Sequence, residues 1–109
     1  MMTRMQECLR ELCVLKLLDD ESLDEVELGR HMNTLPGLAA TKKDIALLLE
    51  RLCHDGLVNS IPKELPTGPG KHAYVLTLQG RQQLSNMSDA WQEVERGVTR
   101  VIAKDRTFG

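Results

Sequence analysis

The order of local structural signals between Thr41 and Arg81 limits the fold more than any other feature of this chain. Thr41 is followed three positions later by an acidic residue, Asp44, and this pattern is typical of a capping box that starts a helix at Lys42. Apolar residues then recur at helical spacing, at Ile45, Leu48, Leu49 and Leu52. Gly56 stands where a left-handed helix end is expected, because glycine adopts that conformation without a steric penalty. The helix is therefore expected to stop there.

Two β-favouring segments follow this helix. Residues 57–61 and 72–78 are each predicted to form a strand, and the loop between them contains three prolines and two glycines. Thr77 is a candidate N-cap for a further helix. Helix, strand, loop, strand and helix in this order are typical of a winged helix-turn-helix. The predicted fold is mainly α with a small β-hairpin, and residues 1–81 form its winged helix-turn-helix domain.

Two more helices are expected before this segment. Residues 3–18 form a largely buried first helix, with an apolar face that includes Met5, Leu9, Leu12 and Cys13. Ser22 followed by Glu25 indicates a capping box for the second helix, which ends near Asn33. Its apolar positions are Val26, Leu28 and Met32. A turn at residues 35–37 leads to the next helix, which therefore takes the recognition position of the pair.

The last segment, residues 78–104, contains no proline and is predicted to be one long helix. Its apolar residues are spaced three and four apart and form a heptad seam: Leu84, Met87, Trp91, Val94, Val98 and Val101. Such a helix would be about 40 Å long, whereas a compact chain of this size has a radius of gyration near ~13 Å. Leu84 and Met87 are expected to pack on the first helix of their own chain, and the seam from Trp91 onward on a second copy. Residues 82–109 are thus predicted to be a dimerisation helix and tail.

The composition fits one small soluble domain. The chain has 109 residues, 41% of them apolar, and no apolar run approaches the ~18 residues of a membrane span. Residues 1–4 lack the apolar region of a signal peptide, so we expect a cytoplasmic protein without membrane contact. No catalytic motif is present and the three histidines stand far apart, so an enzyme is not expected.

The cysteines indicate neither a disulfide framework nor a metal site. Cys8, Cys13 and Cys53 are an odd set without C-x-x-C spacing. We expect buried structural thiols, because free cysteine packs as a small hydrophobe. A redox sensor is the alternative, and it requires an accessible thiol of low pKa. We expect no cofactor.

The distribution of charge is more informative than the net charge of −2. Residues 1–30 contain eight acids against four bases, whereas residues 31–81 contain four acids against six bases. The basic excess in the recognition half is small. Specific binding to DNA would therefore require paired sites in a dimer.

Lysines at the start of the recognition helix are the first candidates for DNA contact. Lys42 and Lys43 follow Thr41 in a first turn where the helix dipole disfavours cations by about 0.3–1 kcal/mol each. Phosphate contact explains their position, and simple solvation is the alternative. Arg51 is the only residue of this helix that is even marginally placed for bidentate base contact. Discrimination is therefore expected to come largely from the wing and from DNA shape.

The wing and the last helix supply further candidates. Lys63, Lys71 and His72 flank the wing loop, and a wing that only closes the hairpin is the alternative. Arg81 is expected to contact either a phosphate or an acidic neighbour. Trp91 is expected in the dimer core, and the alternative is that it lines a gap between subunits in which a planar apolar ligand stacks.

Three segments resemble the PadR family of bacterial regulators. They are I-A-L-L-L-E-R-L at 45–52, D-G-L-V at 55–58 and G-K-H-A-Y-V-L-T-L-Q-G-R at 70–81. The single C-terminal helix with its Trp91 is similar to the short subfamily, some members of which bind planar drugs between paired tryptophans. The resemblance implies a dimeric winged-helix repressor. The chain departs from the family at Ala46, where a tyrosine is usual, and at Ala73, where an aromatic or basic residue is common.

The sequence therefore predicts a homodimeric, DNA-binding transcriptional regulator that represses, and a response to a small planar ligand is compatible with this role. The alternative is a winged-helix adaptor that binds protein and not DNA. The acidic first thirty residues and the weak outer face of the recognition helix favour that alternative.

Overall fold

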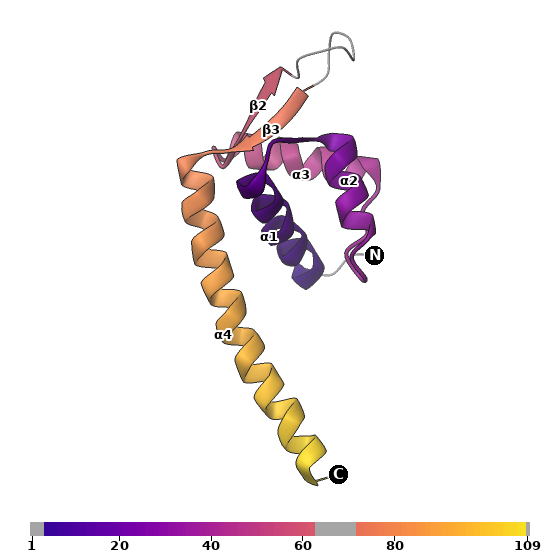
Figure 1. Cartoon of the computed structure of the whole chain (residues 1–109), viewed down its shortest axis with the longest axis vertical. Helices are drawn as coiled ribbons and strands as arrows, with labels where there is room; N and C mark the ends of the chain where they lie inside the picture. The colour runs from indigo at the N-terminus through magenta and orange to yellow at the C-terminus, as the bar shows by residue number, and fades with distance from the viewer. Residues whose placement is uncertain (1–3, 63–71, 109) are drawn as a thin grey trace.

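The computed structural model describes residues 4–62 and 72–108, with side chains to residue 103. The elements, in order, are α1 (Arg4–Asp20), β1 (Leu23–Asp24), α2 (Glu25–Asn33), α3 (Lys42–His54), β2 (Val58–Pro62), β3 (His72–Leu76) and α4 (Leu78–Phe108). α1 to α3 and the small sheet form a compact head, from which α4 extends as a single rod (Figure 1). The predicted fold class is confirmed. None of the described helices combines the length and hydropathy that a bilayer crossing requires.

Both ends of α3 form as the sequence predicts. The Thr41 hydroxyl accepts a hydrogen bond from the Asp44 N–H at 3.1 Å, and the Asp44 carboxylate accepts one from the Thr41 N–H at 3.0 Å. Gly56 follows the helix with φ of 77°. The Leu57 N–H then donates to the Leu52 carbonyl at 3.0 Å, which closes the helix end.

The predicted start of α2 was wrong by two residues. Asp24 is the N-cap, and its carboxylate accepts a hydrogen bond from the Glu27 N–H at 2.8 Å, while the Glu27 carboxylate accepts one from the Asp24 N–H at 2.9 Å. Ser22 does not cap the helix, because Leu23 and Asp24 are extended and pair with Tyr74 and Ala73 of β3. This pairing adds a third strand to the predicted hairpin.

The antiparallel sheet has the strand order β1-β3-β2, in which Val58 pairs with Leu76 and Pro62 with His72. β3 ends before the predicted residue 78, because the Thr77 hydroxyl caps α4 by accepting a hydrogen bond from the Gly80 N–H at 2.9 Å. Gly80 also allows α4 to approach the start of β2. A Cβ there would lie 2.0 Å from the Leu57 carbonyl oxygen.

The core lies between α1, α2, α3 and the base of the sheet. Its most buried side chains are Val14, Leu15, Leu28, Met32, Ile45, Leu49, Leu52 and Val58. The inward face of α1 is centred on Val14, Leu15 and Leu18, so the expectation that Met5 lies on a buried face was wrong. Val26 of α2 is likewise exposed, because the inward positions of that helix are Leu28 and Met32.

Candidate nucleic-acid interface

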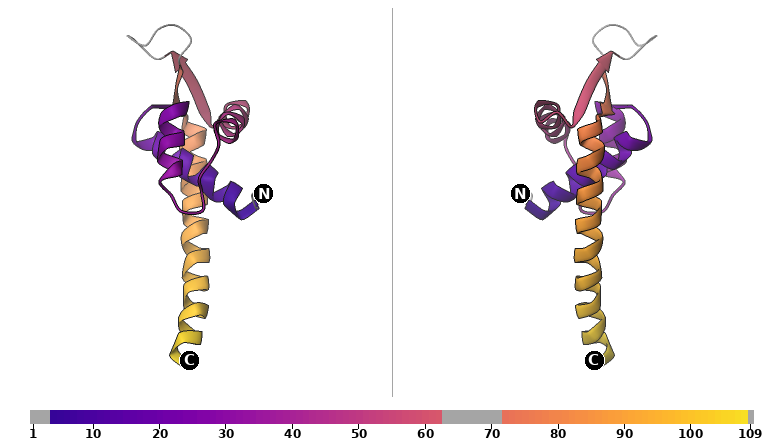
Figure 2. Two further views of the ribbon diagram at one scale, coloured as in Figure 1. Left: turned by 90° about the vertical axis from the view of Figure 1, so that its right-hand side faces the viewer. Right: turned by 90° about the vertical axis from the view of Figure 1, so that its left-hand side faces the viewer.

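α3 presents one continuous outer face to solvent. Ile45, Leu49 and Leu52 point into the core, and the exposed residues on the opposite side are Lys43, Ala46, Leu47, Glu50 and His54. Figure 2 shows α3 end-on at the outside of the head, beside β2. This is the position that a recognition helix takes.

The first turn of α3 carries two cations on a locally capped helix start. Lys42 and Lys43 are exposed, and neither forms an ion pair with any residue that the structure describes. Hydrogen bonds from the backbone and hydroxyl of Thr41, helped by the charges of Arg10 and Lys43, lower the pKa of the Asp44 carboxyl. Asp44 therefore stays ionised while it caps the helix.

α1 holds the turn before α3 through a buried arginine. The Arg10 guanidinium donates to the carbonyl oxygens of Leu38 and Ala39, and its Nη1 lies 3.8 Å from a carboxylate oxygen of Asp44. Only 7% of the Arg10 side chain is exposed. Sequence patterns did not identify this residue, because its partners lie 28 to 34 positions away, as residues 38 to 44, and no local spacing connects them.

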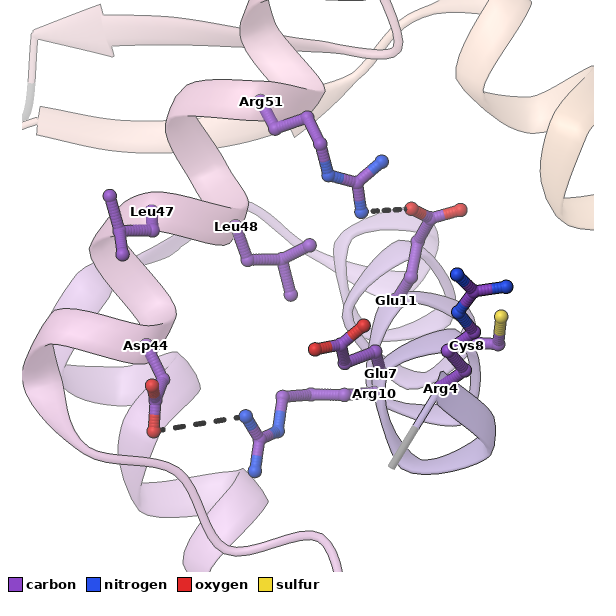
Figure 3. Close-up of a pocket in the computed structure, with 9 residues that line it drawn as sticks. All are labelled: Arg4, Glu7, Cys8, Arg10, Glu11, Asp44, Leu47, Leu48 and Arg51. Carbon is purple, nitrogen blue, oxygen red and sulfur yellow. Dashed lines mark hydrogen bonds and ion pairs between the residues drawn. The ribbon is translucent and has the colours of Figure 1, made fainter. Parts of the chain in front are cut away.

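Arg51, predicted to be only marginally placed for base contact, extends toward α1, and 53% of its side chain is exposed. It pairs with Glu11 of α1 and lies 3.8 Å from the Asp55 carboxylate, one turn further along α3. Figure 3 shows the Arg51–Glu11 and Arg10–Asp44 pairs on either side of a groove between α1 and α3 that Leu47 and Leu48 line. The only arginine of α3 thus has acidic partners within its own chain.

The remaining residues predicted to contact DNA lie in the wing and at the start of α4. Lys63 and Lys71 of the wing lie outside the described residues, and His72 is exposed at the start of β3. The Arg81 Nε donates to the Asp19 carboxylate of α1 at 3.1 Å, so this side chain has the acidic neighbour that was one of its two expected partners.

The heptad seam of α4 divides at Trp91. Leu84 is buried and Met87 packs against the core of the same chain. Beyond them the seam is open: Trp91 is 39% exposed, Val94 57%, Val98 51% and Val101 63%. The rod thus carries an apolar stripe with no partner among the described residues of its own chain.

The cysteines differ from the predicted buried thiols. Cys8 is exposed, and Cys13 and Cys53 are half-buried. Desolvation raises the pKa of the Cys13 and Cys53 thiols above the ordinary value, which disfavours the reactive thiolate. Among the described residues, no group of three or more His, Cys, Asp or Glu side chains is arranged to hold a metal ion.

No protein-family model and no curated protein matches the sequence. Solved structures do match. A PadR-like transcriptional regulator from Bacillus cereus has a TM-score of 0.83 and 24% identity, over 92% of this chain and 97% of that chain. A PadR-like transcription factor from Bacteroides fragilis has a TM-score of 0.75 and 24% identity, over 90% and 94% of the two chains.

Bacillus subtilis PadR, solved in complex with operator DNA, has a TM-score of 0.62 and 23% identity, over 70% of this chain and 45% of that chain. These neighbours are transcriptional regulators and not enzymes. The resemblance found in the sequence is thereby confirmed for the fold, which is that of PadR-like regulators.

Proposed function

We propose that this protein is a DNA-binding transcriptional regulator that acts as a homodimer. The observation that carries the proposal is the start of α3, where Lys42 and Lys43 are exposed and form no ion pair with the residues that the structure describes. The similar fold of Bacillus subtilis PadR, which was solved with operator DNA, supports the same role.

Phosphate contact gives these two lysines a reason to be where they are. The first N–H groups of any helix lack intrahelical partners, and they carry the positive end of the helix dipole. In the free protein, the helix dipole makes this position unfavourable for the two ammonium groups. A DNA phosphate placed there would accept hydrogen bonds from first-turn N–H groups that the Thr41–Asp44 capping box does not use, and its negative charge would attract both ammonium groups. Thr41, Lys42 and Lys43 are therefore assigned to the DNA backbone, together with the wing residues Lys63, Lys71 and His72.

Dimerisation follows from the open part of the heptad seam. A second copy of α4 would cover Trp91, Val94, Val98 and Val101 with residues of the same kind, as in a helical zipper. Two copies would present two α3 helices to successive major grooves about 34 Å apart. Residues 82–109 then serve as the dimerisation helix of a winged helix-turn-helix domain formed by residues 1–81. We assign a repressing role in the cytoplasm, with the space between the two Trp91 side chains as the place for a planar apolar ligand.

One observation favours a second function. The only arginine of α3 is paired with Glu11, and the outer face of the helix includes the apolar Leu47, which would also suit a protein-binding adaptor. The two functions differ in their response to salt, because phosphate contacts release counterions and adaptor contacts do not.

The deciding experiment is selection of bound fragments from random duplex DNA with the full chain. A regulator enriches an inverted repeat, and its affinity for that duplex falls steeply as salt rises. Lys43→Glu lowers the affinity and reduces the salt slope by about 1 for each subunit, or about 2 for the dimer. Lys16→Glu on α1 makes the same change of charge and leaves both values near wild type. An adaptor retains no DNA at low salt.

A further inference from the structure

The middle of the outer face of α3 is apolar. Leu47 is 54% exposed, and Ala46 beside it is also exposed. They are the fifth and sixth residues of α3, in the half of a recognition helix that enters the major groove. Lys43 lies one turn before Leu47 and Glu50 nearly one turn after it, so the leucine occupies the middle of the face.

Lys43 is the described polar residue of this face that suits guanine, and it is assigned to the DNA backbone; the other polar groups around Leu47 are poor readers of guanine. Guanine presents two acceptors, O6 and N7, and arginine is the side chain that most often contacts both. Arg51 is held by Glu11 and Asp55, on the side of α3 that faces α1. Glu50 offers only acceptor oxygens when ionised, and these oppose the two guanine acceptors.

Thymine is the base whose major-groove edge matches this face, because it alone presents a methyl group there. We propose that Leu47, with Ala46 beside it, determines sequence specificity by contacting thymine methyl groups. The ligand is double-stranded DNA with thymine opposite the middle of α3 in each half-site. This inference rests on the proposed function and adds to it the base that α3 reads.

Direct contact of this kind also explains how a helix without a free arginine can discriminate between sequences. The methyl group is buried against Leu47 only when thymine is at the matching position, so the gain is the transfer of about one methyl group out of water. That gain corresponds to roughly a fourfold change in affinity for each methyl group. Two half-sites in a dimer would double this gain in binding free energy.

The test uses the duplex obtained by selection and the full chain. Each thymine is replaced in turn by deoxyuridine, which removes only the methyl group. We expect an affinity loss of about fourfold at the thymines opposite α3 and none elsewhere. In Leu47→Ala both subunits lose the contact, so the affinity for the thymine duplex falls by about 16-fold, and replacement by deoxyuridine has no further effect.

Matched controls separate loss of contact from loss of structure. Leu47 is largely exposed, so Leu47→Ala is expected to keep the thermal unfolding midpoint of the wild type. Met5 of α1 is 67% exposed, so Met5→Ala removes an exposed apolar side chain that is not part of α3. This variant should leave the discrimination of thymine from deoxyuridine intact. Leu47→Gln should shift the preference toward adenine, whose N6 and N7 suit an amide.

The outcomes distinguish this inference from the proposed function. If a duplex binds with the expected dependence on Lys43, and deoxyuridine has the same effect in Leu47→Ala as in the wild type, Leu47 does not read thymine and the inference is overturned. A selected duplex without thymine in the half-sites overturns it as well. If no duplex binds at low salt, both the DNA-binding function and the reading of thymine are rejected.

Discussion

Arg10 of α1 and Asp44 of α3 lie side by side, with 3.8 Å between the guanidinium Nη1 and a carboxylate oxygen. The same guanidinium donates to the Leu38 and Ala39 carbonyls, so one buried side chain connects α1, the turn and the start of α3. Its removal leaves carbonyl groups of the turn without a donor. We expect Arg10→Met to lower the free energy of unfolding by about 2–3 kcal/mol, measured by denaturant titration at a fixed protein concentration.

The control for this variant is Arg96→Met, which removes an exposed arginine from α4 and should change the free energy of unfolding by less than about 0.5 kcal/mol. Arg10→Lys keeps the charge but not the fork of donors, so it should recover only part of the loss. Equal stability of Arg10→Met and the wild type would contradict a role for Arg10 in holding the turn.

Asp44 makes the fold sensitive to acid. The Thr41 hydrogen bonds and the nearby Arg10 lower the pKa of its carboxyl from the ordinary value of 3.8. Because the folded state favours the ionised form, the stabilisation is fully present above the unfolded-state pKa and is lost as the pH falls from there through the folded-state pKa. Asp44→Asn should therefore be less stable than the wild type at pH 7, and the difference should shrink below pH 3.8. Chemical denaturation at a series of pH values measures the difference in free energy of unfolding between the two proteins. A difference that stays constant with pH would show that the charge of Asp44 is irrelevant.

Local patterns predicted those parts of the fold that depend only on neighbouring residues. The Thr41 cap, the Gly56 helix end and the Thr77 cap formed as expected, because each needs only residues within one turn. The start of α2 was misplaced because two overlapping cap patterns compete there. The pairing of Asp24 with Ala73 of β3, far away in sequence, decides between them.

The candidate site was predictable in its position but not in its chemistry. The sequence indicated which helix is exposed and that Lys43 lies on it. It did not show that Arg51 is turned away from the exposed face, because the partner, Glu11, is 40 positions distant on another helix. Arg10 was missed for the same physical reason: a charged residue is buried only when its distant partners compensate the loss of hydration.

Gly80 is required by a close contact between α4 and the start of β2. A Cβ at this position would lie 2.0 Å from the Leu57 carbonyl oxygen and 2.6 Å from a methyl carbon of Leu76. Since backbone must move to relieve this overlap, Gly80→Ala should destabilise the domain by about 2 kcal/mol or more. Gly29→Ala is the matched control, because a Cβ there meets nothing within 4 Å and lies inside α2. It should raise stability by about 0.5–1 kcal/mol. Thermal unfolding of the two variants should therefore shift in opposite directions.

The three thiols should differ in reactivity. Cys8 is exposed, whereas burial raises the pKa of Cys13 and Cys53 and shields both from reagents. In the native protein, one thiol should react rapidly with a disulfide reagent near neutral pH, and Cys8→Ser should abolish that phase. Cys13→Ser should keep it. Three equal rates in the native state would contradict the observed difference in exposure.

The open half of the heptad seam predicts how DNA affinity depends on α4. Val94→Lys/Val98→Lys places two charges on the apolar stripe, and because both positions are exposed in the isolated chain, the variant should remain folded. It should scatter light as a monomer at tens of micromolar protein. Each monomer then binds one half-site, so the affinity for an inverted repeat should fall by about 100-fold or more, and the slope of affinity against salt should be halved.

Gln92→Lys adds a charge on another side of the same helix and is the matched control. It should remain a dimer and bind like the wild type. If the Val94→Lys/Val98→Lys variant still dimerised, the subunits would have to meet through another surface. A monomeric variant could also bind the inverted repeat with wild-type affinity and salt slope. In that case a single half-site would account for all of the phosphate contacts, and the two α3 helices would not act as one bivalent unit.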